Sequence, residues 1–427
     1  MSDASALSSW REQVRCLNQA EGLTWRLQCF VFIYAAAAIA IRAPDMLLNP
    51  QFYAEGGTWY EEAYNLGWAH TLFIPAGGYY LGIFPRLVTA LSLLLPLRLA
   101  PLFTNLCGIA VQALPVSILL SSRCSRWGPL SARLLMAAVY VALPNAGEIH
   151  VVLANAQWHL CLAACLLLLA NPPVHGRWKA FDIAVLLLCG LTGPFCLLLV
   201  PMAAIFWWKR RQTWSAVVCG LLALTSILEA WQLLRGGWHN RSHTSLGATP
   251  SLFAKILAGQ VYLGAFIGQN DFANRSSVLS ATIVFLLGTG LVCWCLFHAG
   301  WELRLFIIFS AMLLAAALRS PLAGGLQAQW DFLATSTGGR YWFFPMLAVL
   351  WSMIWLATQS KSKPSRIIGV VCLPAVLCGE VRDWKYPPFA DQHFSQYVRK
   401  FDAAPFGTAV TIPVCPDGCK MRLIKKS

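Results

Sequence analysis

Residues 27–41 read LQCFVFIYAAAAIAI, an uncharged run that follows a polar lead of 26 residues. Such a run is either a transmembrane helix or the apolar part of a signal peptide, with Ala35–Ala38 resembling a cleavage site. The polar lead is long for a signal peptide, and many similar runs follow. We therefore predict a transmembrane helix here, with a cleaved signal peptide as the competing interpretation.

The composition of the whole chain points the same way. Of its 427 residues, 58% are hydrophobic and only 12% are charged, about half the charged share of an ordinary soluble domain. A soluble protein of this length could not bury so much apolar surface. The composition excludes a plain cytosolic enzyme, a disordered chain and a disulfide scaffold, and it predicts a polytopic membrane protein.

Ten further apolar runs follow the first one. They are 100–121, 130–143, 155–171, 180–192, 194–208, 213–233, 279–298, 304–318, 341–357 and 366–378. We predict an all-α membrane protein with about eleven transmembrane helices. The stretch 79–97 is broken by Pro85, Arg86 and Pro96, so we expect it to lie in the outer interface.

Basic residues predict the orientation of these helices. The 32 Lys and Arg outnumber the 18 Asp and Glu, which in a membrane protein is typical of cytoplasmic loops rather than of nucleic-acid binding. An inside amino terminus places short basic segments on the inner face. These carry Arg11, Arg15, Arg26, Arg123, Arg126, Arg177, Lys179, Lys209, Arg210, Arg211, Arg304, Lys361, Lys363 and Arg366. The three long segments, about 42–99, 234–278 and 319–340, then lie outside with the carboxyl tail.

The tail divides the chain into two parts. We expect a transmembrane domain over 1–378 and a small α+β domain over 379–427 on the outer face. Residues 391–404 are typical of a short helix, and 408–414 and 420–425 of strands around a Pro-Asp-Gly turn. Cys415 and Cys419 flank that turn; whether they form a disulfide, which would need an oxidising compartment, is left open.

The first outer segment holds the first candidate for chemistry. Residues 49–64 read NPQFYAEGGTWYEEAY. We expect a helix to begin near Thr58, with Glu61 and Glu62 stabilising its first turn. Glu55 precedes that helix among aromatic residues, where burial would raise the pKa of its carboxyl group and make it a better base. Glu55 is therefore the leading catalytic candidate.

A second polar cluster lies between two predicted spans. It comprises PNAGEIH at 144–150 and NAQWH at 155–159, and polar groups at this density are costly unless they face water or a cavity. Glu148 is the second catalytic candidate, and His150 and Gln157 are candidate substrate ligands. The alternative is a solvated loop that caps the next helix. A metal is not favoured, because hard cations prefer several oxygen ligands and only Glu148 and Glu55 could supply carboxylates.

The order of these features resembles the GT-C superfamily, whose members are membrane glycosyltransferases that use polyprenyl-phosphate sugars. The likeness is to protein O-mannosyltransferases, to the lipid A aminoarabinose transferase and to uncharacterised bacterial membrane proteins. It rests on Glu55 after the first span, on residues 70–80 (HTLFIPAGGYY), on Leu191-Thr192-Gly193-Pro194 and on Gly338-Gly339-Arg340-Tyr341. Related chains tend to read Ala-Glu-Asp-Gly where this one reads AEGG at 54–57, so any role that needs paired acids is in doubt.

The resemblance implies the roles of several residues. Glu55 would be the general base, and Arg340 with Tyr341 would bind the lipid phosphate, which arginine recognises bidentately. Lys255 and Arg319 are weaker candidates for that phosphate, since most outer cations are interfacial anchors. Glu229 is an acid within a predicted span and is expected either to be functional or to pair with Arg235.

The leading interpretation is thus an inverting glycosyltransferase on the outer face of a bacterial inner membrane. Its partners would be a polyprenyl-phosphate sugar donor, a glycan, lipid or protein acceptor, and the bilayer, with no nucleic acid and no cofactor. A transporter or flippase of lipid-linked sugars is the alternative, and it predicts charged groups along a path across the membrane. A non-catalytic assembly protein is the third hypothesis, for which Glu55 would be dispensable.

Overall fold

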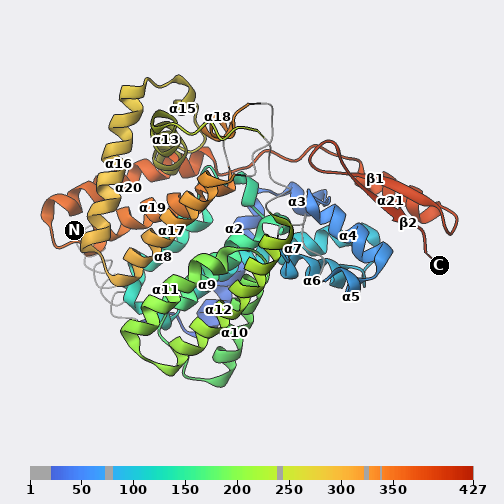
Figure 1. Ribbon diagram of the computed structural model, residues 1–427, viewed down its shortest axis with the longest axis horizontal. Helices are drawn as coiled ribbons and strands as arrows, with labels where there is room; N and C mark the ends of the chain where they lie inside the picture. Colours follow the sequence, from blue (N-terminus) through green and yellow to red (C-terminus); the bar gives the residue numbers. More distant parts are fainter. Residues whose placement is uncertain (1–20, 73–79, 238–243, 322–326, 337–338, 427) are drawn as a thin grey trace, which may run out of the picture.

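The computed structural model describes residues 21–72, 80–237, 244–321, 327–336 and 339–426. Helices dominate, and each of the eleven predicted apolar runs is a helix (Figure 1). These helices are α2 (Trp25–Arg42), α7 (Ala100–Leu119), α8 (Leu130–Val141), α9 (Ala156–Leu169), α10 (Gly176–Gly190), α11 (Phe195–Arg210), α12 (Thr213–Gln232), α16 (Val278–His298), α17 (Trp301–Arg319), α19 (Phe343–Gln359) and α20 (Lys363–Arg382).

Eight helical stretches in the described chain are long and apolar enough to cross a membrane, which indicates a multi-pass membrane protein. Seven of them contain predicted runs: α2, α7, α12, α16, α17, α19 and α20. The eighth, Pro250–Ile267, was not predicted. The other four predicted runs form α8, α9, α10 and α11, which are 12, 14, 15 and 16 residues long.

The connections that were expected to be basic gather at one end of the bundle, here called the basic end. Leu23 N–H donates to Leu120 O at 3.1 Å, which joins the start of α2 to the end of α7. Arg210 Nη1 donates to Ala170 O, which joins the end of α11 to the end of α9. Gln359 at the end of α19 donates to Trp127 O just before α8. These bonds bring one terminus of α2, α7, α8, α9, α11 and α19 to this end. Lys209 at the end of α11 lies over the Trp301 ring, which adds the start of α17.

The ends of α2, α8 and α20 meet at the other end of the bundle, where Arg42 is the central link. Arg42 is 1% exposed, and its guanidinium donates to Leu143 O beyond α8 and to Asp383 O beyond α20. Asp383 Oδ2 in turn accepts from the backbone N–H of Asn145 at 2.9 Å. The candidate functional residues of the sequence lie at this end, which we call the site end.

The unpredicted stretch 250–267 has both termini at the site end. It comprises α13 (Pro250–Ile256), the π-helical turn η6 (Leu257–Leu263) and α14 (Gly264–Ile267). Just before it, Leu246 O accepts from Trp330 N–H, and the Trp330 indole donates to Leu318 O at the end of α17. Just after it, Gln269 N–H donates to Asp383 beyond α20. The stretch therefore returns to the end from which it started.

Two short helices of the first outer segment lie side by side at the site end. α6 (Ile83–Ser92) has ten residues, about 15 Å of helix, which is half the thickness of a bilayer core. Arg86 on α6 is buried and forms an ion pair with Glu62 on α4 (Glu55–Leu66) at 2.7 Å. The prediction that α4 begins near Thr58 was wrong, because its first turn starts at Glu55.

The carboxyl-terminal elements follow the prediction and pack on α4. α21 (Phe394–Ala403), β1 (Ala409–Val414) and β2 (Cys419–Ile424) confirm the expected helix and antiparallel strands, which lie beside α4 in Figure 1. Phe52 and Tyr60 share a small core with Phe401, Ile412 and other residues of the tail. Cys415 and Cys419 are both free thiols. The tail thus shares its hydrophobic core with the first outer segment.

Candidate functional site

An ion pair between two predicted site residues forms the centre of the site end. Arg340, in the turn η7 (Arg340–Trp342) before α19, approaches Glu148 with Nη1 2.7 Å from Oε1. The backbone N–H of Arg340 donates to Glu148 Oε2, also at 2.7 Å. Both side chains are about a quarter to a third exposed (24% and 32%). The pair therefore fixes the η7 turn against the 142–155 loop and still presents both charges to a ligand.

Tyr53 lies between this pair and Glu55. Burial raises the pKa of Tyr53, and the carboxylates of Glu148 and Glu55 raise it further, whereas Arg340 opposes them. Glu55 itself is exposed, which corrects the expectation that it is buried. Among the described residues no hydrogen bond or ion pair engages its carboxylate. Glu55 is thus a free carboxylate beside Tyr53, whereas Glu148 is held by Arg340.

A second tyrosine connects the outer segment with α9 and α12. Gln157 Nε2 donates to Tyr80 Oη at 3.1 Å. Burial raises the pKa of Tyr80 to about 12, which the Gln157 hydrogen bond partly opposes, and Glu55, Arg340 and Glu229 also influence it. Glu55, Arg340 and Glu229 therefore lie close enough to the Tyr80 hydroxyl to act on it electrostatically. They come from three segments of the chain other than the one that carries Tyr80.

Unpartnered polar atoms accompany Tyr80. Gln157 Oε1 is buried without a hydrogen-bond partner in the described chain. Glu229 on α12 is 0% exposed, and neither of its oxygens has a partner of normal geometry there, although it lies near the backbone N–H of Leu81. The expected pairing of Glu229 with Arg235 is wrong, because Arg235 lies over the Trp231 ring instead. Buried polar groups without partners are rare, and here they mark a place suited to a ligand.

A cavity of about 220 Å³ opens beside the ion pair. Its walls include Glu148, Tyr53, Asp45, Gln269 and Tyr386. Asp45 Oδ2 accepts from the backbone N–H of Phe389 at 3.2 Å. The cavity is smaller than most ligand pockets, which measure roughly 300–1,000 Å³, and is suited to a monosaccharide-sized group.

The backbone next to Glu55 is strained and held by the carboxyl-terminal tail. Ala54 has φ 46° and ψ −126°, a conformation that residues with a Cβ rarely adopt. Its N–H donates to Cys415 O at 2.5 Å, and Cys415 N–H donates to Phe52 O at 3.2 Å. The tail therefore sets the direction in which α4 starts and the position of Glu55 in its first turn.

His150 lines the cavity, but both of its ring nitrogens are engaged in contacts that hold the fold. It is 3% exposed, and its two ring nitrogens lie 2.9 Å from Ile39 O and 3.0 Å from Gln112 Nε2. Burial and the nearby Arg42 hold its pKa well below the usual value. The interpretation of His150 as a substrate or metal ligand is therefore wrong, since neither nitrogen is free.

The remaining candidates fall into two groups. Tyr341 is partly buried beside Arg340, whose Nη2 lies 3.5 Å from its hydroxyl. Lys255 on α13 is half-buried and Arg319 at the end of α17 is exposed, and in the part of the chain that the structure describes neither contacts the Glu148–Arg340 pair. Residues 73–79 and Gly338, which belong to the motifs quoted above, lie outside the described residues.

Tyr53, Tyr80 and Asp45 were not selected from the sequence. Tyr53 stands two residues before Glu55 in the quoted 49–64 segment, so its position was a usable signal. Tyr80 ends the motif quoted at 70–80, so its position was also a usable signal. Asp45 carries no pattern of its own, and only the packing of the segment after α2 brings it here. The assembled site offers one free carboxylate, a carboxylate–guanidinium pair and two phenols, a set suited to proton abstraction beside an anionic group. The chain matches no known protein family, and no curated protein is significantly similar to it.

Proposed function

We propose that the chain is a GT-C-like membrane glycosyltransferase. It would transfer a sugar from a polyprenyl-phosphate donor to an acceptor hydroxyl at the site end. The observation that carries the proposal is the cavity lined by Tyr53 and Glu148, with Arg340 paired to Glu148 at 2.7 Å. Glu55 lies within electrostatic range of Tyr53 and of Tyr80. These residues come from segments far apart in sequence, and they join at the end opposite to the basic connections.

The same proposal fixes the membrane arrangement. All eleven helices that run between the basic end and the site end would cross, with the shorter four included. The positive-inside rule then places the basic end in the cytoplasm and the site end in the periplasm of a bacterial inner membrane. The amino terminus would be cytoplasmic and the carboxyl-terminal sheet periplasmic.

The proposed reaction is a single inverting displacement. Glu55 takes the proton of the acceptor hydroxyl, whose oxygen attacks the anomeric carbon of the sugar. The bond between that carbon and the phosphate oxygen breaks, and its electron pair leaves with the lipid phosphate. Arg340 stabilises the negative charge that develops there, and such preorganised charges supply much of the rate enhancement of enzymes.

The structure favours Glu55 over Glu148 as the base. A carboxylate whose oxygens already accept hydrogen bonds from an arginine has fewer lone pairs free to take the proton of an acceptor hydroxyl. Glu148 is held in this way by two contacts of 2.7 Å, and Glu55 has no partner in the described chain. Glu148 would instead orient Arg340 toward the phosphate.

Sugar transfer in membrane vesicles tests the proposal. Wild type, Glu55→Gln and the control Glu61→Gln would be compared at equal expression with a panel of labelled polyprenyl-phosphate sugars. Glu61 lies on the same helix but accepts a hydrogen bond from Arg422 N–H, outside the site. We expect Glu55→Gln to lose about a hundredfold in rate, the scale for losing a general base, and Glu61→Gln to retain activity.

Two outcomes would contradict the proposal. Equal transfer by wild type and Glu55→Gln would exclude Glu55 as the base. Movement of intact lipid-linked sugar across the vesicle membrane without transfer would favour the alternative, a transporter or flippase.

A further inference from the structure

A groove of about 1090 Å³ lies at the basic end, opposite to the candidate site. Its walls come from α2, α7, the end of α9 and the start of α10, and include Cys29, Phe32, Leu114, Leu167 and Phe181. The volume slightly exceeds the usual range for ligand pockets, roughly 300–1,000 Å³. An apolar groove of this size that borders the bilayer is suited to an acyl chain.

The rim of the groove is exposed and apolar on the side of α2 and α10. Ile33 and Trp25 on α2 are each 66% exposed, and Trp178 on α10 is 39% exposed. Large side chains exposed on the flanks of a membrane helix face lipid rather than water. The groove can therefore be entered sideways from the leaflet at the basic end.

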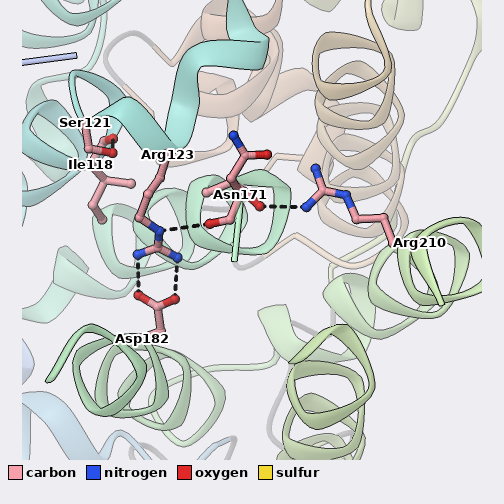
Figure 2. A network of polar contacts seen from close by, with 7 residues as sticks. Ile118, Ser121, Arg123, Asn171, Asp182 and Arg210 are labelled. Atoms are coloured by element: carbon pink, nitrogen blue, oxygen red, sulfur yellow. Dashed lines mark hydrogen bonds and ion pairs between the residues drawn. The ribbon is translucent and has the colours of Figure 1, made fainter. Parts of the chain in front are cut away.

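Cations lie at the mouth of the groove, and one of them has no acidic partner. Arg123 is neutralised by Asp182, with bonds of 2.8 and 2.5 Å, and Asp182 is 1% exposed (Figure 2). Arg177 forms no ion pair in the described chain, and its guanidinium lies 5.9 Å from the Trp178 ring. The groove therefore carries a net positive charge at its mouth, from Arg177.

A fixed polar network forms the inner wall beside these cations. Arg123 Nε donates to Asn171 O at 2.9 Å, and Arg210 Nη1 donates to Ala170 O at 2.9 Å (Figure 2). Ser117 also lines the groove, and its Oγ, which is shielded from solvent, has no hydrogen-bond partner among the described residues. It is two residues from the end of α7, the depth at which a lipid places its ester carbonyl groups.

We infer that the groove binds an anionic phospholipid of the leaflet at the basic end. Its phosphate contacts Arg177, and an acyl chain lies against Phe32 and Phe181. Basic pockets between transmembrane helices recognise anionic headgroups in this way. The site is separate from the proposed glycosyl transfer, and its test does not depend on that activity.

Two exposed native cysteines provide the test. Cys29 lines the groove, and Cys378 is exposed on α20 away from it. Purified protein in detergent would be treated with N-ethylmaleimide, and modification of each thiol followed by mass spectrometry. Dioleoyl phosphatidylglycerol or the zwitterionic dioleoyl phosphatidylcholine would be added at equal mole fraction. We expect phosphatidylglycerol at about four times its Kd to slow modification of Cys29 about fivefold, phosphatidylcholine to have little effect, and Cys378 to respond equally to both.

Matched variants distinguish recognition of the lipid headgroup from binding of the acyl chain. Arg177→Gln should abolish the preference for phosphatidylglycerol, whereas Arg366→Gln, which removes an exposed charge at the same end but outside the groove, should keep it. Equal protection by both lipids would overturn the assignment of an anionic headgroup. No protection by either lipid would overturn the assignment of a lipid. Cys29 could also be modified slowly without lipid and rapidly once residues 1–20 are removed. That result would overturn the assignment of a lipid, because the protein's own amino-terminal residues would occupy the groove.

Discussion

At the scale of single residues, the site depends on the ion pair between Glu148 and Arg340. The sequence around either residue does not reveal that the two are partners. Glu148 and Arg340 were both selected from the sequence, each for its own reason, but they are 192 positions apart. Only the packing of α19 beside α8 brings them together. The sequence supplied the residue types, whereas the pairing, which removes Glu148 as a free base, required the fold.

The coupling of this pair can be measured by a double-mutant cycle. Glu148→Gln and Arg340→Gln should each lower the thermal stability in detergent, and the double variant should lose less than the sum. We expect a coupling of about 0.5–1 kcal/mol, because the pair is partly exposed and solvent screens it. Asp271 and Arg275 form the control pair, 3.2 Å apart and largely exposed, and should show no measurable coupling. Strictly additive losses at Glu148 and Arg340 would contradict the ion pair.

His150 predicts a dependence of stability on pH. Its pKa is lowered by burial among Arg42, Gln112, Tyr386 and Ile39, so the folded protein keeps it neutral while the unfolded chain binds a proton near pH 6.5. Stability is then fully present above pH 6.5 and falls below it, by up to about 1.4 kcal/mol per pH unit. Thermal unfolding from pH 7.5 to 5 measures this slope. His150→Gln should make the slope shallower while the buried His159 remains in place, and an unchanged slope would assign the effect to another group.

At the scale of elements, apolar runs identified helices well and their boundaries less well. Every predicted run is a helix because hydrocarbon requires backbone groups to pair within their own segment. The stretch 250–267 was missed because Lys255 and Gln260 interrupt its apolar character. The start of α4 was missed because two glycines after Glu55 are poor helix formers, and the contacts of the tail with Phe52 and Ala54 override that preference.

Neighbouring glycines in α4 test how the tail docks on this helix. A Cβ at Gly57 would lie 2.8 Å from Val414 of β1, whereas one at Gly56 would meet only Phe52 at 4.0 Å. Gly57→Ala should therefore loosen the tail and accelerate its proteolysis. Adding Val414→Ala should reverse part of that effect, because it removes the clashing methyl groups.

Gly56→Ala is the matched control for this experiment. It should leave proteolysis unchanged and stabilise α4 by about 0.5–1 kcal/mol, since alanine is the better helix former. Equal proteolysis of Gly56→Ala and Gly57→Ala would contradict the contact between α4 and β1. Under the proposed function, Gly57→Ala should also reduce transfer, because the same tail holds the backbone beside Glu55.

At the scale of the whole molecule, the two ends of the bundle make a topological prediction. Reporter fusions at residue 125 should lie on one side of the membrane, and fusions at residues 247, 270 and the carboxyl terminus on the other. Positions 247 and 270 flank the stretch 250–267, whose termini both lie at the site end. Reporters on opposite sides at 247 and 270 would show that this stretch crosses. Charge patterning predicted the two ends from sequence, but it could not show that 250–267 turns back.

The short helices have a consequence for the membrane itself. α10 and α11, with 15 and 16 residues, are only about 22–24 Å long, and a bilayer core is about 30 Å thick. Both helices have side chains exposed on the flank of the bundle. Under the proposed arrangement, in which both helices cross, the lipids that border them would compress to match their length. The protein would then make the membrane thinner on one of its flanks, which would shorten the distance between the two leaflets there.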